Sequence, residues 1–424
     1  MSLAKKKNEK ETGKREIPQK IFVFFVKIFK VLLSHPLTLG IDISDHSIEV
    51  LGLDPEKNIK VYGRAVLEDG IVENGNIKDA KKLGEVFQKT LENVKPEPLK
   101  KKNNGRIKAV FSLPESRTFI KELEFYSRHD LEENIKKSIE KNIPLVFESL
   151  YWDYIELDGN VNGPEEKIRV LAVAIPGDVV DQYVYFFWIN GIDPIAFDIE
   201  AASIGRALLS PKKQKESVAI VDIGARTSVI NIFNQKGNLA MSSSLLYAGN
   251  YFTREISHEL KISQNEAEKI KQEMGLAKEP VAPILEKCLS FLIEEIKDAL
   301  GYYQGKFGDE VGKIILAGGS TLLPGIEEYF QKNTKKSVEI GNSLLNIKKT
   351  SLLPEKRAIL FANVIGLAIR GISSNPADSG INLLLEKIKR RQKTLLSERK
   401  RFFLFVFIFV ISLLFLLLTI LFLA

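Results

Sequence analysis

Cysteine and histidine are scarce in this sequence of 424 residues, which has one cysteine, Cys288, and four histidines. A single cysteine excludes a disulfide framework within the chain. The histidines, His35, His46, His129 and His258, follow no ligand spacing, so a zinc site is not expected. With 45% hydrophobic and 27% charged residues, the chain can form two or three bodies with real cores.

Excess positive charge is also absent from most of the chain. The net charge is +7, but residues 1–35 and 381–401 each carry +6, which leaves −5 for the remaining residues. A basic protein often binds nucleic acid. Because the basic residues lie in two short segments beside an acidic body, we expect no nucleic-acid partner.

Residues 402–424 contain no charged residue, and only Ser412 and Thr419 are polar. A helix of this length spans the ~30 Å of a bilayer core. The basic residues just before it stay on the cytoplasmic side by the positive-inside rule. The sequence therefore predicts a single C-terminal transmembrane helix, with the globular body in the cytoplasm.

An apolar run at 21–33 contains Lys27 and Lys30, and no small-residue cleavage site follows it. This pattern does not fit a cleavable signal peptide. Two interpretations stay open for the N-terminal segment 1–36. It is either a basic amphipathic helix on an anionic membrane surface, or a helix that packs against the body or a partner.

Residues 37–53 and 217–233 share one pattern: a strand ending in Ile-Asp-Ile, a polar turn, and a second strand. Asp42 and Asp222 occupy the matching positions. This internal repeat predicts a duplicated α/β lobe. Each turn can present backbone N–H groups to phosphate oxygens, while each aspartate can hold Mg²⁺ through water.

A third element, Gly318-Gly319-Ser320, lies between a predicted strand and a predicted helix. Paired glycines let a base or sugar lie against bare backbone, and a helix N-terminus accepts an anion. The order of the three elements resembles the actin, Hsp70 and sugar-kinase ATPase superfamily. Within it, residues 37–372 resemble the PilM family of type IV pilus assembly. The resemblance is carried by GIDIS (40–44), NIPLVFESLYWDY (142–154), VDIGART (221–227), AGNYFTREI (248–256) and LAGGSTLLPGI (316–326).

The resemblance implies a two-lobed actin-like fold, that is, a duplicated RNase H-like ATPase fold with a small inserted α+β subdomain. The implied divisions are lobe 1 at 37–113, continued at 196–216 and 357–372, the insertion at 114–195 and lobe 2 at 217–356. The composition of residues 373–380, SSNPADSG, predicts a flexible linker after them. The resemblance also implies ATP and Mg²⁺ in a cleft between the lobes. The implied nucleotide-binding residues are Asp42, Ser44, Ser47, Asp222, Gly224, Thr227, Gly249, Asn250, Glu268, Lys271, Gly318, Gly319 and Ser320. Asp42 and Asp222 would hold the Mg²⁺ through water.

The first turn departs from the family pattern, because Ser44-Asp45-His46-Ser47 lacks a glycine and adds a carboxylate. Either Asp45 points away from the phosphates or nucleotide affinity suffers, since like charges repel. A degenerate cleft that serves only as scaffold is the alternative to ATP binding. We expect little ATP turnover, and no catalytic base can be named from the sequence.

Residues Ile381, Asn382, Leu383 and Leu384 resemble the start of PilN, the inner-membrane partner of PilM. The resemblance implies that they bind a PilM-type body, in cis or on a neighbouring copy. The alternative is that they form the first turn of a juxtamembrane helix.

Taken together, these features predict an inner-membrane-anchored scaffold of type IV pilus assembly that couples membrane components to cytoplasmic machinery. Its expected partners are the inner membrane and PilN- or PilO-like proteins, and self-association is possible. The alternatives are an FtsA-like division tether, a GspL-like component of type II secretion, or a small-molecule kinase. A kinase needs a carboxylate base aimed at a substrate hydroxyl, and no such motif stands out.

Overall fold

The computed structural model describes residues 37–96, 106–157, 167–212 and 214–384, together with Val406, Ile408, Ser412 and Thr419. All the elements below belong to one compact unit, which begins at Leu37. The predicted segments 1–36 and 385–401, and most of the predicted span 402–424, lie outside the described residues. Among the residues that are described, no helix combines the length and apolarity that crossing a membrane requires.

Lobe 1 is built on a five-stranded sheet in the order β10-β6-β1-β2-β3. β1 pairs antiparallel with β2, and β2 with β3, while β1, β6 and β10 run parallel. These strands are β1 (Thr38–Ile43), β2 (Ser47–Leu53), β3 (Ile59–Val66), β6 (Ile107–Leu113) and β10 (Ile192–Ile199). The helices that share its apolar core are α2 (Ala80–Glu92), α4 (Gly177–Ile189), α5 (Glu200–Leu208) and α11 (Ala362–Gly371). The short strands β4 (Val72–Glu73) and β5 (Asn76–Ile77) pair with each other.

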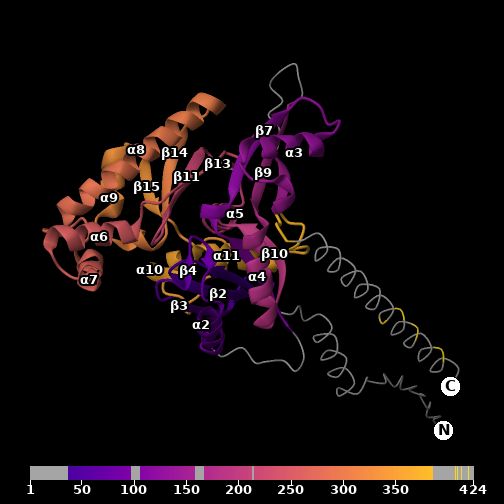
Figure 1. The fold of residues 1–424 in the computed structure, drawn as a ribbon, viewed down its shortest axis with the longest axis horizontal. Coiled ribbons are helices and arrows are strands. Elements are labelled where there is room, and N and C mark those ends of the chain that lie inside the picture. Colours follow the sequence, from indigo (N-terminus) through magenta and orange to yellow (C-terminus); the bar gives the residue numbers. More distant parts are fainter. Residues whose placement is uncertain are drawn as a thin grey trace, which may run out of the picture. The chain divides into compact units, whose positions relative to one another are not determined.

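Lobe 2 repeats this arrangement with the order β13-β12-β11-β14-β15. Its strands are β11 (Ser217–Ile223), β12 (Ser228–Phe233), β13 (Leu239–Leu245), β14 (Val311–Ala317) and β15 (Ser337–Ile340). Its helices are α6 (Gly249–Leu260), α7 (Gln264–Met274), α8 (Val281–Phe307) and α9 (Ile326–Thr334). Figure 1 shows the orange helices α8 and α9 beside the strands of this sheet. β11–β12 matches β1–β2 in position and direction, so the predicted duplication is confirmed.

A three-stranded antiparallel sheet in the order β7-β9-β8 forms the inserted subdomain. It consists of β7 (Phe119–Phe125), β8 (Leu150–Leu157) and β9 (Ile168–Pro176), with α3 (Leu131–Asn142) packed on it around a separate small core. The predicted end of the insertion at residue 195 differs from the structure. Val179 and Phe187 of α4 are buried in the lobe 1 core, and β10 pairs with β6. The insertion therefore ends near Pro176.

Helix α11 is pressed directly on the lobe 1 sheet. A Cβ on Gly40 of β1 would collide with the carbonyl of Val364, and would lie 2.8 Å from the backbone nitrogen of Ala368. Glycine at this position lets the helix backbone contact the strand, so α11 and β1 move together. The four-residue helix α10 (Glu355–Ala358) precedes α11.

Candidate functional site

The two corresponding turns lie on one cleft of about 1200 Å³. All thirteen nucleotide-binding residues expected from the sequence line it: Asp42, Ser44, Ser47, Asp222, Gly224, Thr227, Gly249, Asn250, Glu268, Lys271, Gly318, Gly319 and Ser320. Six of them lie at or next to the ends of β1 and β11 or in the first turn of α6. The structure thus brings together residues that are up to 278 positions apart, from Asp42 to Ser320.

The first turn, between β1 and β2, is organised by the Ser44 hydroxyl. It accepts hydrogen bonds from the backbone nitrogens of His46 (3.2 Å) and Ser47 (3.0 Å). The backbone nitrogen of Ser44 donates to the carbonyl of Ser47 at 2.9 Å. A serine side chain therefore closes this turn, where the family pattern has a glycine.

The second turn, between β11 and β12, is tied to lobe 2 through backbone groups. Gly224 donates to the carbonyl of Thr227 at 3.0 Å, and its own carbonyl accepts from the backbone nitrogen of Gly249 at 3.1 Å. The Ser320 hydroxyl donates to the same Gly224 carbonyl at 3.2 Å. Asn250 donates its backbone N–H to the Ala225 carbonyl at 2.6 Å. The second turn, α6 and the Gly-Gly turn thus form one hydrogen-bonded wall.

Asp42 and Asp222 stand at the ends of β1 and β11 and are partly exposed to the cleft. Burial raises the pKa of Asp222 to about 7, and the nearby carboxyls of Asp42 and Glu115 add to the shift. Burial also raises the pKa of Asp42, against hydrogen bonds from Asn363 and Ser112. A cation beside the two aspartates would relieve this repulsion.

The described residues contain no group of three or more acidic, His or Cys side chains placed to hold a metal ion. Two carboxylates without a third protein ligand fit Mg²⁺ better than Ca²⁺ or Zn²⁺. Magnesium keeps several waters and is commonly bound through one or two carboxylates plus substrate phosphates. The donor set is therefore compatible with Mg²⁺ held through water.

Gly318 has a positive φ of 85° and lies against Asp222. A Cβ at this position would collide with the Asp222 carboxylate and would lie 2.5 Å from the Ile223 carbonyl oxygen. Only glycine at position 318 allows the Gly-Gly turn to lie this close to the end of β11. The Asp222 side chain therefore keeps its position at the cleft.

Lys271 on α7 is almost fully buried, with 4% of its surface exposed. Its Nζ donates to the Gly249 carbonyl (2.9 Å), the Thr253 hydroxyl (2.7 Å) and Glu268 Oε2 (2.7 Å). Burial lowers the pKa of Lys271, while the charge of Glu268 opposes the shift. Burial alone would raise the pKa of Glu268, but Lys271 outweighs it and the pKa falls. The ion pair joins α6 to α7 at the cleft wall.

The Asp45 side chain of the first turn reaches toward lobe 2. Its carboxylate accepts hydrogen bonds from the backbone nitrogens of Asn74 (2.8 Å) and Gly75 (2.9 Å). It also forms an ion pair with Arg226 of the second turn. Asp45 and Arg226 thus bridge the two lobes across the cleft.

Glu115, Glu200 and Asn363 are among the polar residues of the cleft that were not predicted from the sequence. Glu115 accepts from the backbone nitrogen of Ala201 (3.1 Å) and from the Ser242 hydroxyl, which makes a second bridge between the lobes. Burial raises the pKa of Glu115 to about 7. Burial first, and then neighbouring carboxyls, raise the pKa of Glu200 well above its usual value. Glu115 follows β6 and Glu200 follows β10, which is the only sequence signal these two carry, whereas Asn363 lies at the start of α11.

Residues 381–384 pack against β10 and the inserted sheet. Ile381 and Asn382 are each 2% exposed. Phe197 of β10 donates its backbone N–H to Asn382 Oδ1 (3.0 Å) and accepts from the backbone nitrogen of Leu383 (2.9 Å). The backbone nitrogen of Asn382 donates to Asp153 of β8 at 2.8 Å. The segment therefore joins the free edge of the lobe 1 sheet to the insertion, and its residues have no helical structure.

The predicted flexible linker 373–380 is also held in place. Arg370 donates to the carbonyls of Pro376 (2.8 Å) and Gly380 (3.4 Å), and the Asn382 side chain donates to the Ala377 carbonyl (2.9 Å). Composition predicted flexibility because Ser, Pro and Gly do not form regular structure. The contacts from a buried arginine override that preference.

The profile of the family described as type IV pilus assembly protein PilM matches residues 40–372. The chain belongs to the PilM family. A solved structure described as the PilM-PilN type IV pilus biogenesis complex has 17% identity and a TM-score of 0.69, covering 79% of this chain and 98% of that one. The ethanolamine utilization protein EutJ from Carboxydothermus hydrogenoformans has 15% identity and a TM-score of 0.51, covering 80% and 90%. At these identities the two likenesses show the fold, and the predicted two-lobed actin-like architecture is confirmed.

Cell division protein FtsA from Bacillus subtilis (strain 168) is 24% identical over 177 residues, which are 36% of this chain and 40% of FtsA. The chain thus spans about two fifths of the length of this curated relative. FtsA is a distant relative, whereas the PilM profile matches most of the chain. This PilM-family chain is a type IV pilus assembly protein by family.

Proposed function

We propose that this PilM-family protein binds ATP with Mg²⁺ in the cleft between its lobes and acts as a scaffold of type IV pilus assembly. The observation that carries the proposal is the meeting of thirteen residues, nine from the three motifs and four from α6 and α7, on one cleft between two equivalent strand ends. Such a cleft, with a turn from each lobe, can hold a polyanion by backbone N–H groups and a cation at once.

The residues on the cleft suit different parts of the nucleotide. Asp42 and Asp222 would hold Mg²⁺ through water, and the Mg²⁺ would neutralise charge on the phosphates. The turns at Ser44 and Gly224 face the phosphates, and Gly318 leaves bare backbone for the base or ribose. Glu268, on α7, has one carboxylate oxygen paired with Lys271 and lines the same cleft, where it can accept hydrogen bonds from ribose hydroxyls.

ATP binding would act through the two lobes. The Asp45–Arg226 ion pair crosses the cleft, and the Glu115–Ser242 hydrogen bond joins the cleft residue Glu115 to β13 of lobe 2. A ligand that contacts both turns favours the conformation in which the lobes are together, and it shifts the population of surfaces offered to partners. This role requires binding and only slow turnover, so we propose a nucleotide-dependent scaffold with little ATPase activity.

The protein would also be attached to the inner membrane and would bind partner proteins there. Residues 402–424 would anchor the chain in the inner membrane, with the basic segment before them and the body in the cytoplasm. The docked residues 381–384 form a PilN-like peptide, which supports PilN- and PilO-like proteins as partners. The same peptide could dock on a second copy and support self-association. Removal of residues 402–424 is expected to move the protein from the membrane to the soluble fraction, and continued membrane sedimentation would contradict the anchor.

Calorimetric titration of the full chain with ATP and Mg²⁺ tests the nucleotide site. We expect saturable binding that Asp222→Asn weakens at least tenfold, since one good charge-assisted contact contributes about 1.4 kcal/mol or more. Asp298→Ala, on the exposed side of α8, is the matched control and should bind as the parent does. No heat and no thermal shift at millimolar ATP would reduce the chain to a nucleotide-free scaffold.

A further inference from the structure

Helix α11 connects the cleft to the docked C-terminal segment, defined here as residues 376–384. Its first residues, Ala362 and Asn363, line the cleft. Arg370, in its last turn, contacts the docked segment. At 1.5 Å rise per residue, Asn363 and Arg370 lie ~10 Å apart along the helix axis. One short helix therefore has an end at each site.

At the cleft end, Asn363 joins α11 to three neighbouring elements. Its Nδ2 donates to the Ser112 hydroxyl of β6 at 2.8 Å, and its Oδ1 accepts from the Ser203 hydroxyl of α5. Ser112 in turn donates to Asp42 Oδ1 at 3.2 Å. The first turn of α11 is thus part of the polar network that surrounds the cleft.

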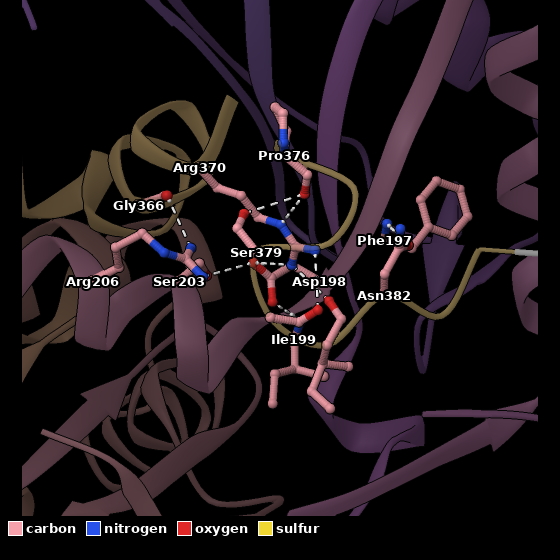
Figure 2. Close-up of polar contacts among 12 residues, drawn as sticks. Phe197, Asp198, Ile199, Ser203, Arg206, Gly366, Arg370, Pro376, Ser379 and Asn382 are labelled. Atoms are coloured by element: carbon pink, nitrogen blue, oxygen red, sulfur yellow. Dashed lines mark hydrogen bonds and ion pairs between the residues drawn. The ribbon is translucent and has the colours of Figure 1, made fainter. Parts of the chain in front are cut away.

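At the other end, the Arg370 side chain is 0% exposed and holds the docked segment by its main chain. Besides the contacts to Pro376 and Gly380, Nη1 donates to the Ile381 carbonyl at 2.6 Å. The Arg370 charge is neutralised by Asp198 of β10 at 2.8 Å, and Asp198 also pairs with Arg206 of α5 at 3.1 Å. Figure 2 shows this cluster of α11, β10, α5 and the docked segment.

The docked segment cannot leave without consequence for α11. Three carbonyls of the segment satisfy the donors of a buried guanidinium, and a buried donor that loses its partner is unfavourable. Release of the segment therefore requires the last turn of α11 to open or to move. An opening of this kind is a local unfolding event, which hydrogen exchange measures.

Helix α11 is packed too closely against its neighbours to absorb such a movement. A Cβ on Gly366 of α11 would collide with the Ser203 carbonyl of α5, and Gly40 of β1 makes the equivalent contact with Val364. Gly366 also accepts a hydrogen bond from Arg206 at 3.0 Å. Because α11, α5 and β1 are in backbone contact, a displacement at Arg370 is transmitted to Asn363.

We propose that helix α11 links occupancy of the cleft to docking of residues 376–384. Bound nucleotide favours the docked state of the segment, and release of the segment weakens nucleotide binding. The proposal rests on the proposed function, namely that the cleft binds ATP. A ligand against the first turn of α11 reduces the opening of the helix, and this makes release of the segment rarer. Thermodynamic linkage requires that ATP favour docking of the segment by the same factor by which docking tightens ATP binding.

Hydrogen–deuterium exchange of the full chain, with and without MgATP, tests one direction of the linkage. We expect saturating MgATP to slow exchange of the Asn382, Leu383 and Leu384 amides about fivefold or more, the lower end of typical coupling between sites. ATP titration of Asn382→Ala tests the other direction, and the ATP Kd should rise by the same factor. Asn375→Ala is the matched control, because Asn375 is exposed and its side chain donates to the exposed Asp378 rather than to α11 or β10.

Arg370→Lys is the second variant, since it keeps the charge beside Asp198 but loses the planar donors. Unchanged exchange of the β14 amides shows that each variant is folded. If ATP binds while exchange of 376–384 and the Kd of both variants stay within twofold of the parent and of Asn375→Ala, the linkage is wrong and the proposed function stands. If ATP does not bind the parent, the proposed function fails and the linkage fails with it.

Discussion

Replacing Asp45 with Asn is expected to tighten ATP binding about fivefold to tenfold, because it removes a carboxylate that competes with phosphate. Asp45 pairs with Arg226 across the cleft. An incoming phosphate meets the negative charge of Asp45 and finds Arg226 already neutralised. Asn keeps the shape of the side chain and one acceptor oxygen for the backbone N–H groups of Asn74 and Gly75, so the turn is retained.

The magnitude follows from the exposure of the pair. Two unit charges ~4 Å apart interact by about 4 kcal/mol at an effective dielectric of about 20. The Asp45 and Arg226 side chains are 20% and 31% exposed, and solvent screening reduces such a pair to about 1 kcal/mol. A gain of about 1 to 1.4 kcal/mol in binding is a change of about fivefold to tenfold in Kd.

The assay is calorimetric titration with ATP at constant Mg²⁺ and salt. Asp69→Asn is the matched control, since Asp69 is an exposed carboxyl on the same cleft. Arg226→Gln should weaken binding, and adding Asp45→Asn to it should recover less than Asp45→Asn gains alone. The reasoning is refuted if Asp45→Asn leaves the Kd unchanged or raises it, or if Asp69→Asn gives the same gain.

Two further predictions concern the floor of the cleft. Gly318→Ala should cost about 1 to 3 kcal/mol more than Gly237→Ala in urea unfolding, because both have positive φ but only Gly318 lies against Asp222 and Ile223. Equal losses would contradict the close approach. The pKa of Glu115 is raised to about 7, so the folded state keeps a proton that the unfolded chain releases. The free energy of unfolding should fall as pH rises from about 4.5 to about 7, by at most about 1.4 kcal/mol per pH unit, and Glu115→Gln should flatten this fall.

The parts of the site that belong to a repeat or to a family motif could be predicted from the sequence, and isolated polar residues could not. Asp42 and Asp222 stand out because the same strand-turn-strand pattern occurs around each, and Gly318 because paired glycines follow a strand. Glu200 and Asn363 each come from one place in the chain, with no pattern around them. Only the topology brings the start of α5 and the start of α11 to the cleft.

The C-terminal end of the insertion could not be predicted from the sequence for a different reason. The apolar positions of α4, such as Val179 and Phe187, predict a buried helix, but periodicity does not tell which core buries it. The structure packs α4 into lobe 1. The linker 373–380 was misjudged for a related reason. Its composition predicts a loop, and a loop is held or free according to a distant residue, here Arg370.

The two turns of the duplicated lobes have diverged in a complementary way. The second turn keeps its glycine and carries Arg226, while the first has a serine that closes it and Asp45, which pairs with that arginine. Each change alone would disturb an anion site: an added carboxylate repels phosphate, and an unpaired arginine attracts any anion. Together they give the cleft an internal bridge that phosphate must displace. The predicted consequence is a nucleotide site of reduced affinity whose occupancy alters the contact between the lobes, which suits a switchable scaffold better than an enzyme.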